Sequence, residues 1–252
     1  MSLFVCLKKV SFVKNHQNDY YKFMIKFKNA YLGNFILGIL AGMAIAVGGL
    51  LNIVCLTFGQ KILGGILFSV GLITVCFFGL HLYTGKFGYI LENNREYYIS
   101  LLIMLLGNFV GAVLFGYFLR LVGLHNSQCA NTIATVSLKK TLDLGSGTGQ
   151  PWWKMFVLSF MCCNLVFLAV DIYKKNKNWL VKLGGILICV PLFVILGMEH
   201  CVADMFYLAA GNRYFELPLE CISALLVSIA GNSLGAVFFY LVINKSSLAK
   251  KI

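Results

Sequence analysis

Two short stretches of this sequence place ionisable and hydroxyl side chains inside long apolar segments. One stretch contains His81 and Thr84, and the other contains Glu199 and His200. An ionisable side chain at membrane depth costs free energy, so it marks a candidate functional site. Histidine titrates near neutral pH, and in a narrow apolar passage His200 could lend positive charge or a proton to an anion. The hydroxyl of Thr84 could donate a hydrogen bond to the same anion.

Other chemistries fit these residues less well. His81 and His200 could in principle ligate a haem, which would make the chain a membrane redox subunit, but each lies in a polar break rather than in a regular helix. Glu199 and His200 are not part of an H-E-x-x-H motif, so a metalloprotease is disfavoured. The nine cysteines contain no C-x-x-C pair, which argues against a zinc site. We therefore expect no metal and no cofactor.

The composition is that of a membrane protein. Of the 252 residues, 60% are hydrophobic and 12% are charged, whereas about a quarter of an ordinary soluble domain is charged. Six segments are apolar and long enough to span a bilayer: 31–54, 62–91, 100–124, 152–173, 183–210 and 219–243. The second and fifth are too long for one simple span and contain the polar breaks. We therefore expect an all-α membrane protein with six transmembrane helices, the second and fifth broken.

The distribution of lysine and arginine predicts the orientation. With a cytoplasmic N-terminus, the inner segments hold fifteen of these residues and the outer segments five, which is a positive-inside bias. We expect a basic cytoplasmic segment at 1–30, a membrane domain at 31–243 and a cytoplasmic tail at 244–252, in the inner (plasma) membrane of the cell. The net charge of +12 then needs no nucleic-acid partner, and the N-terminal segment can bind anionic lipid headgroups.

The two halves of the chain repeat a motif. The pattern G-N-x-x-G-A-V-x-F begins at Gly107 and again at Gly231. Three spans per half is an odd number, so the second half enters the membrane with opposite polarity and the repeat is inverted. In such folds the substrate site lies near the midplane, at paired interrupted helices. The site is therefore expected at the two breaks, 79–86 and 197–204.

These residues also carry a resemblance to a known family. From about Ala30 to Ile243 the chain resembles the formate/nitrite transporter family. The matching stretches are Leu82–Gly85, Gly107-Asn108, Cys163–Val166, Leu168–Val170, Glu199-His200, Ala203, Met205-Phe206 and Gly231-Asn232. Each is weak alone, but together, in this order and in these spans, they are specific.

The resemblance implies a homopentamer of aquaporin-like protomers, each with its own pore for a small monovalent anion. Formate is our first choice, with nitrite and hydrosulfide as alternatives. The resemblance further implies that His200 is the central histidine, that Thr84 faces it from a mobile loop, and that Asn164 is a polar residue beside the pore. The positions that match apolar constrictions are Phe68, Leu72, Leu82 and Phe193.

The chain departs from the family pattern at three positions in the breaks. His81 stands where the family usually has glutamate, and Lys86 and Asp204 stand where it usually has asparagine. Because Lys86 and Asp204 occupy equivalent positions of the two halves, we expect them to form an ion pair that offsets the cost of burying each charge. The alternative is two separately solvated charges near helix ends.

The family's lysine in the outer vestibule has no clean counterpart. Lys154 lies close to Asn164 in the sequence, while Lys139 and Lys140 lie far upstream. Any of these lysines could supply the positive field that gathers anions.

A transport function is therefore expected rather than an enzymatic one. A scaffold without transport is disfavoured, because it has no use for polar residues at the midplane. A channel for water or neutral solutes is a closer alternative. Its permeation rate would depend neither on the membrane potential nor on the charge of His200.

Overall fold

The computed structural model describes residues 30–249, and this part of the chain is almost wholly helical. In chain order the elements are α2 (Ala30–Thr57), α3 (Lys61–Phe77), η1 (Phe87–Glu92), α4 (Arg95–Leu121), η2 (Leu124–Asn126), α5 (Ala130–Lys139), α6 (Trp152–Lys175), α7 (Trp179–Ile195), α8 (Cys201–Ala210), α9 (Arg213–Glu216) and α10 (Pro218–Ala249). No strand occurs within the described range, where the β-pairing is one isolated bridge between Leu142 and Gln150. The all-α prediction is confirmed.

Four helices, α2, α4, α6 and α10, are long and apolar enough to cross a membrane. Two further apolar segments are interrupted. The first is α3, a non-helical link and η1, and the second is α7, a non-helical link and α8. The interruptions lie in the second and fifth apolar segments, as the sequence predicts.

The two interruptions begin in the same way. Gly79 and Gly197 follow the ends of α3 and α7 with φ of 63° and 68°, in the left-handed region that glycine adopts without strain. In each case the next amide donates to a carbonyl five residues earlier, Leu80 to Val75 and Met198 to Phe193. These bonds close off the helix ends.

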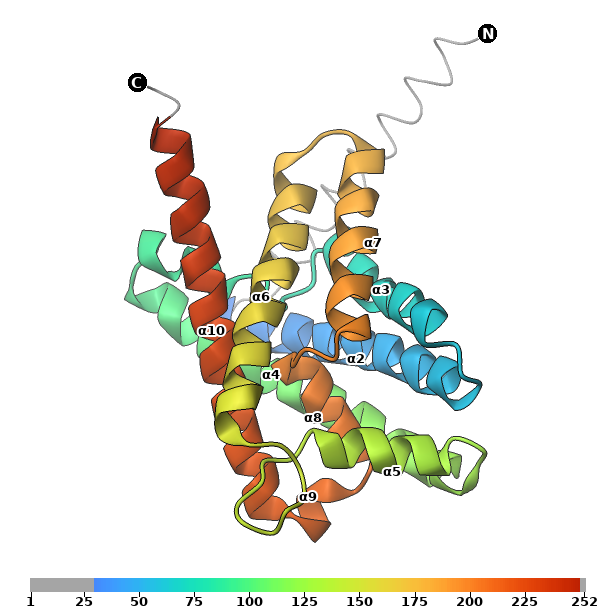
Figure 1. The fold of residues 1–252 in the computed structure, drawn as a ribbon. Coiled ribbons are helices and arrows are strands. Elements are labelled where there is room, and N and C mark those ends of the chain that lie inside the picture. Colours follow the sequence, from blue (N-terminus) through green and yellow to red (C-terminus); the bar gives the residue numbers. More distant parts are fainter. Residues whose placement is uncertain (1–29, 250–252) are drawn as a thin grey trace, which may run out of the picture.

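The helices pack in a crossed arrangement. Within the halves, α2 lies against α3 and α4, and α6 lies against α7 and α10; Figure 1 shows α6 and α10 running side by side. The second limb of each broken segment crosses to the other half, because α8 packs on α4 and α2 while η1 packs on α10. Since α3 and α7 also pack on each other, both breaks lie at the interface between the halves.

Glycines bring the long helices into backbone contact. A methyl group added at Gly111 in α4 would lie 2.0 Å from the carbonyl oxygen of Ile39 in α2. In the second half, a methyl group at Gly235 in α10 would lie 2.2 Å from the carbonyl oxygen of Phe160 in α6. These small residues set the close approach of each helix pair, which is their usual role in membranes.

Three features differ from expectation or fall outside it. The predicted basic segment at 1–30 lies, apart from Ala30, outside the described residues. Helix α10 runs through the predicted boundary at 243 and ends at Ala249. The long connection between the third and fourth spans contains a helix that was not predicted, the ten-residue α5.

The glycine contacts generate a testable prediction. Gly111→Ala should destabilise the protein by about 1–3 kcal/mol, because α2 and α4 must move apart to admit the methyl group. Gly184→Ala is the matched control, since a methyl group there meets no atom within 4 Å, and alanine favours the helix. Thermal unfolding in detergent checks both variants; equal melting temperatures would contradict the packing account.

Candidate functional site

Asn108 holds the first break in place. Its side chain is fully buried. The Oδ1 atom accepts a hydrogen bond from the backbone amide of Tyr83 at 2.9 Å. The Nδ2 group donates to the carbonyl oxygens of Gly38 at 2.8 Å and His81 at 2.9 Å. One side chain thus ties the unwound backbone to α2 and α4.

Asn232 makes the same three bonds in the second half. Its Oδ1 accepts from the amide of Cys201 at 2.8 Å, and its Nδ2 donates to the carbonyl oxygens of Ser159 at 2.7 Å and Glu199 at 2.9 Å. We call Asn108 and Asn232 the asparagine clamps. Unwound backbone at membrane depth requires such partners, because lipid supplies none.

The clamped breaks meet at Thr84 and His200. The Thr84 hydroxyl lies 2.9 Å from Nε2 of His200, and both side chains are at most 2% exposed. The Nδ1 atom of His200 accepts a hydrogen bond from the amide of Ala203 at 3.2 Å, at the start of α8. An amide can only donate, so a neutral His200 carries its proton on Nε2 and directs it at Thr84. This geometry favours a neutral hydrogen-bond donor rather than the cation considered from sequence.

Two further contacts support the loop that carries Thr84. The Tyr83 hydroxyl lies 2.8 Å from the hydroxyl of Ser233 in α10. The thiol of Cys163 in α6 lies 3.6 Å from the carbonyl oxygen of Thr84. Sequence reasoning did not predict these pairs, because they join residues 79 or more positions apart and follow no motif.

An aromatic pair lies beside His200. The rings of Phe68 in α3 and Phe193 in α7 are 5.7 Å apart, edge to face, and Phe193 stacks on the His200 ring at 6.0 Å. Both phenylalanines are buried, as are the other two predicted constriction residues, Leu72 and Leu82. An apolar ring of this kind raises the barrier to a hydrated ion.

A cavity of about 640 Å³ ends on this aromatic pair. Its deep lining includes Phe68, Phe193 and His200. Its rim includes the exposed lysines Lys61, Lys139 and Lys154. Within residues 30–249 none of these three lysines forms an ion pair, so their charge is free to attract anions toward the aromatic pair. Lys154, which was predicted to lie on the anion pathway, is among the residues that line the cavity.

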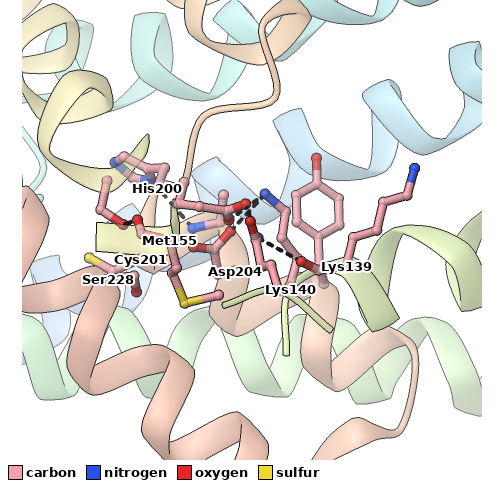
Figure 2. A network of polar contacts seen from close by, with 12 residues as sticks. Lys139, Lys140, Met155, His200, Cys201, Asp204 and Ser228 are labelled. Carbon is pink, nitrogen blue, oxygen red and sulfur yellow. Dashed lines mark hydrogen bonds and ion pairs between the residues drawn. The ribbon is translucent and has the colours of Figure 1, made fainter. Parts of the chain in front are cut away.

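Lys140 has a different role from its neighbours. Its ammonium lies 2.6 Å from Oε2 of Glu199 and 3.2 Å from Oδ1 of Asp204, and Gln150 donates to Oε1 of Glu199 at 2.6 Å. In Figure 2, Lys140 points to Asp204, while the side chain of Lys139 extends away. Burial alone would lower the pKa of Lys140, but the two carboxylates outweigh it and raise the pKa above its usual value.

The predicted ion pair between Lys86 and Asp204 is wrong. Asp204 pairs with Lys140 instead, and Lys86 forms no ion pair with any described residue. Lys86 follows Thr84 by two residues and Asp204 follows His200 by four, so the two residues lie on either side of the Thr84–His200 contact. Asp204 lines the cavity, whereas Lys86 does not.

Asn164 and the haem alternative both lose support. The Asn164 amide donates to Phe160 of its own helix at 2.7 Å, and Asn164 is absent from the cavity lining. Both ring nitrogens of His200 are engaged, by Thr84 and by Ala203. A haem iron would need a free nitrogen lone pair, so this geometry does not fit a haem ligated by His81 and His200.

Comparison with known proteins places these features in a wider context. Residues 20–246 match the family model described as formate/nitrite transporter. The chain is 30% identical to the formate-nitrite transporter of Entamoeba histolytica over 226 residues, which cover 81% of this chain and 61% of that protein. It is 27% identical to formate channel FocA of Haemophilus influenzae over 169 residues, covering 63% and 57%. The matches thus span about three fifths of the length of these two relatives.

Solved structures show the same fold. The chain superposes on a structure titled FNT family ion channel with a TM-score of 0.71 and 21% identity, covering 92% of this chain and 97% of the other. It superposes on a pentameric formate channel with formate bound with a TM-score of 0.64 and 22% identity, covering 89% and 96%. The predicted fold class is confirmed by these likenesses.

The Lys140 network generates the second prediction. Lys140→Met should destabilise the protein by about 3–5 kcal/mol, because it leaves two buried carboxyl groups without a counter-charge. Lys139→Met is the matched control, and its effect should stay within about 0.5 kcal/mol. Combining Lys140→Met with Glu199→Gln and Asp204→Asn should restore most of the loss. Thermal unfolding in detergent measures all three; a Lys140→Met protein as stable as the parent would contradict the assignment.

Proposed function

The chain belongs to the formate/nitrite transporter family, and from this premise we propose that it is a membrane channel or transporter for a small monovalent anion. In keeping with the family, its activity is transport rather than catalysis. Formate is the first candidate, because several relatives are named formate channels or transporters. Nitrite and hydrosulfide are the alternatives, since each is also small and carries one charge.

The contact between Thr84 and His200 is the observation that carries this proposal. It joins the two breaks in a site closed off from bulk water, next to the aromatic pair. With its proton on Nε2, His200 offers a donor without carrying a charge that would trap the anion. Thr84 accepts from His200, so its own hydroxyl proton can turn to the anion.

The cavity supports a sequence of steps along the pathway. Lys61, Lys139 and Lys154 raise the local anion concentration at the mouth. At Phe68 and Phe193 the anion sheds water, which is the main barrier. The hydrogen bonds from Thr84 and His200 then offset part of the lost hydration. Entry into the opposite half follows once those bonds break.

We extend the proposal to assembly and topology. The likeness to a pentameric channel supports a homopentamer. Large apolar side chains exposed on the long helices, such as Leu102, Leu114 and Leu226, are suited to lipid or to neighbouring protomers. The lysine distribution supports cytoplasmic termini in the plasma membrane, with 31–243 as the membrane domain between two cytoplasmic segments.

Anion flux into proteoliposomes tests the function. We expect formate to enter faster than chloride, with nitrite and hydrosulfide as the comparison anions. His200→Asn should slow formate flux by about tenfold or more, since a lost hydrogen bond to a charged ligand costs about 1.5–3 kcal/mol. His125→Asn, a histidine outside both breaks, should leave the rate unchanged. Absence of flux for all four anions, with folded and inserted protein, would require withdrawal of the proposal.

A further inference from the structure

The two breaks share one hydrogen-bond frame but carry opposite charges. The carbonyl oxygens of His81 and Glu199 accept equivalent bonds from the two asparagine clamps. Five residues later, Lys86 and Asp204 are also equivalent. The first break therefore presents two basic side chains where the second presents two acidic ones.

The acidic pair has a counter-charge. Lys140 comes from the connection between the halves rather than from the repeat, and its ammonium lies between the carboxylates of Glu199 and Asp204 at 2.6 and 3.2 Å. The ion pairs with this ammonium offset the cost of burying the two acids, although neither carboxylate oxygen of Asp204 accepts a hydrogen bond.

The basic pair has no such partner among residues 30–249. The His81 side chain is 8% exposed, and its Nδ1 atom is buried without a hydrogen bond. Lys86 forms no ion pair with a described residue. A buried donor without a partner costs free energy, and the partly exposed Lys86 has no counter-charge among the described residues. The first break therefore lacks a group that the second break has.

The surroundings of the basic pair add positive charge. Lys174 of α6 lies close enough to repel positive charge on both His81 and Lys86, and its ammonium stands 4.5 Å from the ring centre of Tyr89. Asp171, the acid that acts on Lys174, is already bound by Lys175 and by the Tyr89 hydroxyl, each at 2.9 Å. The local field thus favours an anion.

We propose that His81 and Lys86 bind a small anion of the carboxylate or nitrite class, in the position that the Lys140 ammonium takes in the other half. An anion with two oxygens can bridge two donors, just as that ammonium bridges two acceptors. Neither His81 nor Lys86 lines the cavity, so the site lies on the other side of the Thr84–His200 contact. Thr84, between His81 and Lys86 in the chain, contacts His200, so an anion released from this site is next to the central donors. This last step rests on the proposed function, whereas the binding itself does not.

Binding of radiolabelled formate to the purified full-length protein in detergent tests the site. Measurements in the parent and in the His200→Asn background separate this site from the central one. In both backgrounds, Lys86→Asn should weaken binding about tenfold, the size expected for a lost charge-assisted hydrogen bond. Asparagine is also the residue that the family usually has there, so the fold should tolerate it. His81→Leu should act in the same direction.

The matched control is Lys175→Gln. Lys175 neighbours Lys174, is 56% exposed at its side chain and pairs with Asp171; its loss should change binding by less than about twofold. A Lys86→Asn protein that binds formate and nitrite like the parent would overturn the inference. So would a parent that binds neither anion.

Three further outcomes separate the competing explanations. Asp19 is the one acidic residue outside the described range; anion binding that arises only in Asp19→Asn would mean that this carboxylate neutralises the basic pair, which overturns the inference. Anion binding that depends on Lys86, in a parent protein that transports no anion, would support the site while contradicting the proposed function. Normal anion flux together with anion binding that is unchanged in Lys86→Asn would contradict the site while supporting the proposed function.

Discussion

The asparagine clamps are the constraint on which the rest of the structure depends. An interrupted helix at membrane depth leaves backbone amides and carbonyls that lipid cannot satisfy. Asn108 and Asn232 each accept one amide and donate to two carbonyls. They fix the backbone of both breaks against the neighbouring helices. Only with both backbones fixed can Thr84 from one half meet His200 from the other.

The charges are arranged so that the central site stays neutral. Lys140 neutralises part of the Glu199 and Asp204 charge at the side of the cavity, and exposed lysines form the rim. At the centre, Ala203 fixes the tautomer of His200, and Phe68 and Phe193 exclude water. Under the proposed function, an anion is attracted by charge at a distance but held by neutral donors at the centre. Weak holding of this kind allows release as well as entry.

Much of this could be predicted from the sequence, because it follows from local patterns. The repeated G-N-x-x-G-A-V-x-F motif contains both clamp asparagines, although their role was not predicted, and the polar stretches in the second and fifth apolar segments located the breaks. The pairing of Asp204 could not be predicted, because Lys139 and Lys140 are adjacent in one connection and only their three-dimensional positions distinguish them. The short helix α5, which positions Lys140, was missed because its ten residues mix apolar and polar side chains and are too few to span a membrane. The equivalence of Lys86 and Asp204 was correctly recognised, but equivalent positions of an inverted repeat need not face each other, and Asp204 pairs with Lys140 instead.

The most direct test of the account is a double-mutant cycle between Thr84 and His200, read out as formate flux into proteoliposomes. Thr84→Val and His200→Asn are measured alone and together. If the two side chains form one site, the double variant should be no slower than the slower single variant, because either change already removes the shared donor arrangement. If the two reductions multiply, Thr84 and His200 act independently, and a single anion site built from the two breaks is contradicted.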